Sequence, residues 1–96
     1  MERKPTNPQI PAIHLNGTSR ESLIEALSDA ACALGEAIEK TAQTYPNARD
    51  YYVLPTGALN RAEAQHASRM ERLRDVYAEL KELAEGIYDA PGPRRK

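Results

Sequence analysis

The sequence predicts an all-α fold, an antiparallel two-helix hairpin behind an extended N-terminal arm, which we expect to be oligomeric or docked on a partner. Residues 19–45 and 57–88 repeat apolar side chains at intervals of three and four, the spacing that gathers them on one side of a helix. A connector at residues 46–56 begins with a proline and separates the two helices. The predicted divisions are an extended arm (1–17), a helical hairpin (18–88) and a basic tail (89–96).

The N-terminal arm is rich in proline, which lacks an amide donor and biases the preceding residue toward extended geometry. Its prolines stand at every third position: Pro5, Pro8 and Pro11. The arm also carries Ile10, Ile13 and Leu15, and strand-like alternation would put Ile13 and Leu15 on the same side. Two interpretations stay open, a disordered tail or an arm that lies on a neighbouring surface as an added strand.

The first predicted helix opens with a capping box, because Thr18 precedes Glu21 by three residues, and it ends at Tyr45 before Pro46. Its seam has a regular helical spacing: Ile24, Leu27, Ala31, Leu34, Ile38, Thr41 and Tyr45. Gly35 lies in the helix interior, where glycine costs about 1 kcal/mol relative to alanine. We therefore expect Gly35 to permit the close approach of another helix.

The second predicted helix is capped by Thr56 and extends over roughly 48 Å at about 1.5 Å per residue. Its apolar stripe recurs every seven residues, at Leu59, His66, Leu73, Leu80 and Ile87. We expect Leu73, Tyr77 and Leu80 to bind a partner through this stripe. Arg69 lies beside the stripe, where its stem can pack while its guanidinium reaches a carboxylate across an interface.

The connector contains an apolar cluster, Tyr51-Tyr52-Val53-Leu54, that is unusual for a solvent loop. One interpretation is a plug that closes the end of the helix pair. The other is a docking point at which Tyr51 and Tyr52 bind a partner, since paired tyrosines combine a large contact area with polar tips.

The composition predicts a thin core. Ninety-six residues allow one small domain, and the chain has no Phe and no Trp. Apolar burial stabilises by about 25 cal/mol per Å², so the small side chains of this chain contribute little each. A small helical protein of this kind commonly buries further surface in a homo-oligomer or on a partner protein.

The charge distribution argues against nucleic acid as a partner. The net charge is −1, and residues 18–88 carry eight Lys/Arg against twelve Asp/Glu. A nucleic-acid face needs basic residues clustered on one surface. The last three residues are basic, Arg94, Arg95 and Lys96, but three charges would give only weak and salt-sensitive affinity for phosphate.

No arrangement in the sequence predicts an enzyme, a cofactor site or a metal site. Glu63 and His66 form a Glu-x-x-His step, but di-metal bundles need this step twice, with further carboxylates on facing helices. We expect His66 to be a packing residue that hydrogen-bonds Glu63 or Asn60. Cys32 has acidic neighbours, whereas a nucleophilic thiolate needs cationic ones.

A single cysteine excludes an intrachain disulfide, and the sequence has neither a signal-peptide pattern nor 18 consecutive apolar residues. We therefore expect a soluble protein of intracellular origin with no membrane partner.

Three stretches resemble a group of small uncharacterised proteins encoded among the head and packaging genes of tailed bacteriophages and prophages. They are the run Ile13-His14-Leu15-Asn16-Gly17-Thr18-Ser19, the connector Pro46-Asn47-Ala48-Arg49-Asp50-Tyr51-Tyr52, and the run Gln65-His66-Ala67-Ser68-Arg69. The resemblance covers residues 13–88 and brings no activity with it. It implies a phage setting, in which a helical hairpin of this kind is an assembly or virion component.

These observations predict a non-enzymatic bacteriophage structural or assembly protein that binds other virion proteins of the head or neck through its helix seams and its arm. It would be found in the host cytoplasm during assembly and in the virion. An alternative is a phage-encoded inhibitor or regulator that binds a host protein. A DNA-binding or packaging module is a third hypothesis, disfavoured by the acidic body.

Overall fold

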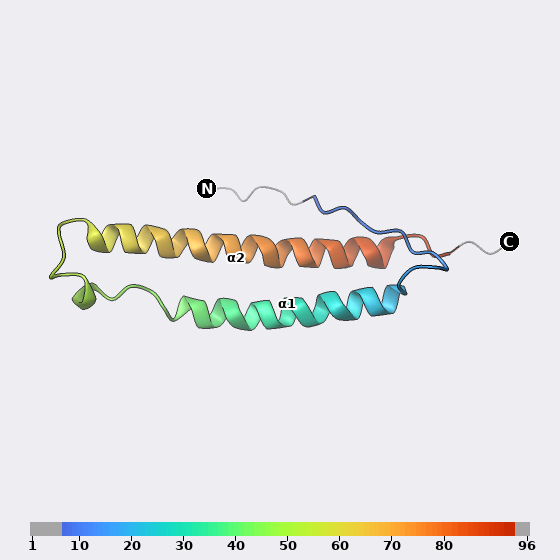
Figure 1. Ribbon diagram of the computed structural model, residues 1–96, viewed down its shortest axis with the longest axis horizontal. Helices are drawn as coiled ribbons and strands as arrows, with labels where there is room; N and C mark the ends of the chain where they lie inside the picture. The colour runs from blue at the N-terminus through green and yellow to red at the C-terminus, as the bar shows by residue number, and fades with distance from the viewer. Residues whose placement is uncertain (1–6, 94–96) are drawn as a thin grey trace.

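A computed structural model describes residues 7–93 of the chain. Two helices, α1 (Arg20–Ala42) and α2 (Ala58–Asp89), are joined through a short 3₁₀ helix, η1 (Ala48–Asp50). Figure 1 shows α1 and α2 side by side and antiparallel, with the connector at one end and the arm at the other. Residues 7–93 contain no strand, so the all-helical prediction is confirmed. The predicted arm before Asn7 and the three basic residues of the predicted tail lie outside the described residues.

Helix α1 begins with a different cap from the one the sequence predicted. Ser19 is the N-cap, and its Oγ accepts a hydrogen bond from the backbone N–H of Ser22 at 3.1 Å. The predicted pairing of Thr18 with Glu21 is therefore wrong by one residue. A serine satisfies the same orphan amide as a threonine would, so two adjacent hydroxyl residues leave the cap ambiguous in the sequence.

The end of α1 at Ala42 is three residues earlier than predicted. The amides of Gln43 and Thr44 bond to the carbonyls of Lys40 and Thr41, at 3.1 and 2.9 Å, in the tighter i to i−3 pattern. Pro46 disfavours helical geometry at Tyr45. Pro46 therefore ends α1 several residues before its own position, and Tyr45 lies outside the helix.

Helix α2 is not capped by Thr56, contrary to the prediction. Its N-cap is Gly57, with φ of +94° and no side-chain capping bond. The chain must adopt a left-handed conformation there to enter the helix, and glycine does so without a steric penalty. At its other end Ala90 is extended, as expected before Pro91.

The hairpin is long and thin. Its principal extents are 72 × 23 × 16 Å, and its radius of gyration is 19.4 Å, against about 13 Å for a compact chain of similar length. Only three side chains among the described residues are buried, Met70, Ile87 and His66, and all belong to α2. Helix α1 has no buried side chain, so its contact with α2 leaves its apolar seam partly exposed to solvent.

Candidate association surfaces

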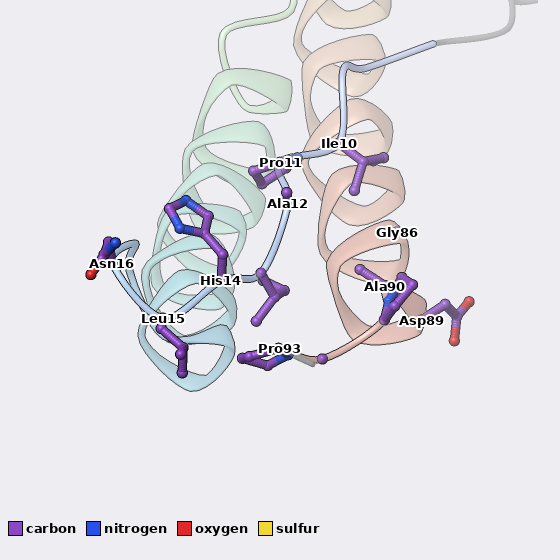
Figure 2. A pocket seen from close by; sticks show the side chains of 13 residues that line it. Ile10, Pro11, Ala12, His14, Leu15, Asn16, Gly86, Asp89, Ala90 and Pro93 are labelled. Carbon is purple, nitrogen blue, oxygen red and sulfur yellow. The ribbon is translucent and has the colours of Figure 1, made fainter. Parts of the chain in front are cut away.

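The arm lies on the C-terminal end of its own α2, where Ile10 occupies a notch left by Gly86. A Cβ built on Gly86 would overlap Cδ1 of Ile10 and would lie only 2.8 Å from its Cγ1. Figure 2 shows Ile10 beside α2 at the level of Gly86. We call this contact the Gly86 notch. Space rather than backbone angle distinguishes this glycine: a Cβ at position 86 would force Ile10 to shift from its observed place against the helix.

A groove of about 670 Å³ extends from the Gly86 notch to the end of the hairpin, between the arm and the segment that follows α2. Ile10 and Ile13 are half-buried, whereas Leu15 is 83 % exposed. The expected pairing of Ile13 with Leu15 on one side is therefore wrong. Residues 7–17 of the arm do not form an added strand, because side chains rather than a backbone ladder hold this part of the arm against a helix.

The chain reverses between the arm and α1 in a tight turn. The amide of Gly17 donates to the carbonyl of His14 at 3.1 Å, and a Cβ on Gly17 would lie 2.8 Å from the His14 imidazole. Just beyond the turn, Nη2 of Arg20 donates to the carbonyl oxygen of Ala90. A cation at a helix C-terminus also meets the negative end of the helix dipole, so Arg20 links the start of α1 to the end of α2.

The predicted partner-binding residues of α2 divide into two groups. Leu73, Tyr77 and Leu80 are half-buried, and Tyr77 and Leu80 share a groove with α1 residues such as Leu27, so packing within the chain already uses part of their surface. Arg69 is exposed. Lys81 Nζ lies 5.6 Å from the centroid of the Tyr77 ring, within the range of a cation–π interaction.

The structure does not require glycine at position 35 for the close helix approach that the sequence predicted. A Cβ on Gly35 would lie 3.6 Å from Cε2 of Tyr77, an ordinary van der Waals distance. An alanine would fit without displacing the ring. The approach of the two helices therefore does not require glycine at this position.

The connector end of the hairpin is closed by a polar cluster of three side chains. The hydroxyl of Tyr45 donates to Oε2 of Glu63 at 2.7 Å, and its ring meets the His66 ring edge to face, with centroids 5.2 Å apart. The hydrogen bond to Glu63 raises the pKa of Tyr45, with smaller contributions from desolvation and from the charge of Glu63. The carboxylate holds the phenol proton in place because it stabilises the neutral hydroxyl.

His66 is buried, as expected for a packing residue, at 5 % exposure. The expected hydrogen bond to Glu63 or Asn60 is not formed, and within residues 7–93 its Nδ1 has no hydrogen-bond partner. Glu63 bonds to Tyr45 instead. The helical spacing of the sequence predicts Tyr45 in the seam of the first helix, whereas α1 ends at Ala42 and leaves the Tyr45 ring free to contact Glu63 and His66.

The two tyrosines of the connector differ in their burial. Tyr51 is half-buried and follows η1, as a plug would, whereas Tyr52 is 79 % exposed. Val53 and Leu54 are 73 % and 49 % exposed. Tyr52, Val53 and Leu54 together form what we call the connector patch. The half-burial of Tyr51 agrees with a plug, whereas partner binding through Tyr51 and Tyr52 stays a prediction.

The residues considered for chemistry lie apart. His14 belongs to the arm, Cys32 is exposed on α1, and His66 is buried in α2. In the part of the chain that the structure describes, no group of three or more His, Cys, Asp or Glu side chains could hold a metal ion. Neither described helix combines the length and the apolar character that crossing a bilayer demands.

Comparison of the chain with known protein families, with curated proteins and with solved structures finds no match.

Proposed function

We propose that this protein is a non-enzymatic association module, a small bacteriophage structural or assembly component that binds virion proteins of the head or neck and its own copies. The phage setting of this proposal comes from the resemblance of the entry to the first helix and of the connector. The mode of action comes from the shape and burial of the hairpin.

One observation supports association above all others: in a molecule with a longest extent of 72 Å, the described residues bury only two apolar side chains, Met70 and Ile87, and helix α1 buries none. Folding has to offset a large loss of conformational entropy, and small domains with little apolar burial commonly rely on oligomerisation. A surface partner would bury the half-covered seams and add the missing area.

Two regions are suited to such a partner. The connector patch exposes an aromatic and two aliphatic side chains in succession at one end of the hairpin. At the other end, Leu15 and Tyr88 are 83 % and 72 % exposed. Aromatic side chains surrounded by aliphatic ones are typical of the energetically dominant part of protein interfaces.

Size-exclusion chromatography with light scattering over a dilution series tests the proposal. We expect the full chain to be an oligomer, or to form a stable complex when virion head or neck proteins are added. A stably folded monomer that ignores both would contradict the proposal. Mass spectrometry of purified particles then separates a virion component from the alternative regulator, which would be absent from particles.

A matched pair of variants assigns the surface. Tyr52→Ser with Val53→Ser removes the two most exposed apolar side chains of the connector patch without touching a buried side chain, so the fold should be retained. We expect complex formation to weaken about tenfold or more if this patch carries binding. Gln65→Ser, an exposed change on α2, is the control and should leave binding unchanged.

A further inference from the structure

We propose that residues 7–15 form an exchangeable arm, and that the Gly86 notch of one copy receives Ile10 of a second copy. This inference rests on the self-association in the proposed function and specifies its contact. In the structure the arm occupies the notch of its own chain. In the exchanged state the same contact forms between two chains.

The notch selects its occupant by shape. The missing Cβ of Gly86 leaves room for one branched aliphatic side chain, and Ile10 fills this room down to distances at which a single added carbon would collide. Pro8 and Pro11 flank Ile10 and hold the backbone extended without offering amide donors. Recognition therefore depends on the Ile10 side chain entering the Gly86 notch. Ile10 of a second copy can make the same contact.

The arm is attached in a way that allows it to leave. No hydrogen bond joins residues 7–15 to α2 among the described residues, and the bond of Gln9 Nε2 to the Ile10 carbonyl is internal to the arm. The reversal into α1 depends on one backbone hydrogen bond, from Gly17 to His14, in a segment whose residues 14–19 are all exposed. Opening this turn releases the arm without disturbing either helix.

The notch is accessible to another chain. Figure 1 shows the arm along the edge of α2, and in Figure 2 it crosses from α2 at Ile10 toward α1 through Pro11 and Ala12, which are exposed. An incoming arm can therefore reach Gly86 without parting the two helices. Each copy offers one arm and one notch, so exchange re-forms the contact of Ile10 with Gly86 between two chains, at the loss of the turn at Gly17, and adds whatever surface the two hairpins share. Exchange of an identical element between copies is a low-cost route to association, and mass action favours it as concentration rises.

Disulfide trapping between two variants tests the exchange. Ile10→Cys and Gly86→Cys are prepared separately, each with Cys32→Ser so that no other thiol is present. A Cβ at position 86 lies 2.8 Å from the γ position of residue 10, close to the roughly 3 Å between a Cβ and the far sulfur of a disulfide. The two proteins are mixed while reduced and then oxidised.

We expect a covalent pair that contains one chain of each variant, with a yield that rises with concentration. Ile10→Cys keeps a free notch for the Ile10 of the other variant, so the mixed pair has no steric conflict. A mixture of Gly86→Cys with Tyr52→Cys, whose exposed position lies at the opposite end of the hairpin, measures random collision. A yield no higher than this control overturns the exchange.

The double variant Ile10→Cys with Gly86→Cys tests the exchange a second time, through the size of its oxidised products. Exchange predicts covalent dimers or longer chains at high concentration. A product that stays monomeric at every concentration, with its disulfide closed within one chain, overturns the inference.

A third measurement uses two matched glycine substitutions. Gly86→Ala places a carbon where Ile10 lies, whereas Gly35→Ala makes the same change in a helix interior with room for it. We expect Gly86→Ala to weaken self-association at least tenfold and Gly35→Ala to leave it at the wild-type value, with both retaining helical circular dichroism. Wild-type association in Gly86→Ala overturns the exchange while the proposed association stands. A wild-type chain that is monomeric and binds no virion protein overturns the proposed function itself.

Discussion

The two ends of the hairpin are closed by different chemistry. At the arm end an aliphatic side chain, Ile10, enters the Gly86 notch beside Ile87, which is 1 % exposed. At the connector end the Tyr45 hydroxyl bonds to the Glu63 carboxylate, and His66 is buried with an Nδ1 that has no hydrogen-bond partner among residues 7–93. Only the arm end has a fully buried aliphatic side chain among the described residues.

This difference indicates which end contributes more to the stability of the fold. Within residues 7–93 each end buries a polar atom that has no hydrogen-bond partner, Nε of Arg20 at the arm end and Nδ1 of His66 at the connector end, and each atom has a desolvation cost. The two ends differ in apolar burial, which stabilises the fold and is complete only at Ile87. The arm end should therefore be the more stable of the two. The connector end, with its exposed patch and its polar cluster, is the end more easily altered by pH or by a partner.

The largest expected effect is at the arm end. Ile87→Ala should reduce the free energy of unfolding by about 3 kcal/mol, because it empties the most fully buried aliphatic site. Leu59→Ala, at the half-buried start of α2 beside the connector, should cost about 1 kcal/mol. Urea unfolding of both variants at one protein concentration measures the contrast, and equal losses would remove the distinction between the two ends.

The next effect concerns Gly57, a glycine required by its backbone angle. Gly57→Ala should destabilise the protein by about 1–2 kcal/mol, because its φ of +94° is strained for any residue with a Cβ. Gly57→Asn should cost less, since asparagine tolerates left-handed geometry better. Thermal unfolding followed by circular dichroism compares the two, and a loss as large for asparagine as for alanine would point to a cause other than the backbone angle.

A smaller effect of opposite sign is expected in the middle of the hairpin. Gly35→Ala should stabilise the protein by up to about 1 kcal/mol, since α1 gains helix propensity and the new Cβ meets Tyr77 at an ordinary distance. Chemical denaturation checks the sign. Destabilisation by this substitution would show that the helices do need glycine there, as the sequence suggested.

The smallest effect concerns pH at the connector end. Because the pKa of Tyr45 is raised in the folded protein, folding favours its neutral form. This contribution is fully present below the unfolded pKa of about 10 and is lost as the pH rises through the raised folded value. Tyr45→Phe should therefore lessen the loss of thermal stability above pH 10, measured by melting curves across the alkaline range. Tyr52→Phe, at an exposed position, is the control and should leave that loss in place.

Much of the fold follows from local patterns. The spacing of Ile24, Leu27 and Leu34 in one segment and of Leu59, Leu73 and Leu80 in the other predicts two helices with one apolar side each, because side-chain direction along a helix is fixed by its period. The absence of Phe and Trp predicts a thin core, and the described hairpin has a thin core. Boundaries were less accurate, as at Thr56 and Tyr45, because one proline or glycine can redirect several residues.

The association surfaces were less predictable. Ile10 and Gly86 are 76 positions apart, and neither has any local pattern that refers to the other. A glycine inside a helix signals a close approach in general, but this signal was equally present at Gly35, where the structure leaves room for a methyl group.

The sequence by itself determined two amphipathic helices, the breaks between them and a core poor in bulk, because these depend on backbone geometry and on the size of side chains near one another in the chain. Only the tertiary structure decided which glycine receives a side chain, which tyrosine closes the connector end and where the arm lies. Those outcomes depend on distances between segments far apart in the chain, and such distances exist only once α1 and α2 have packed together.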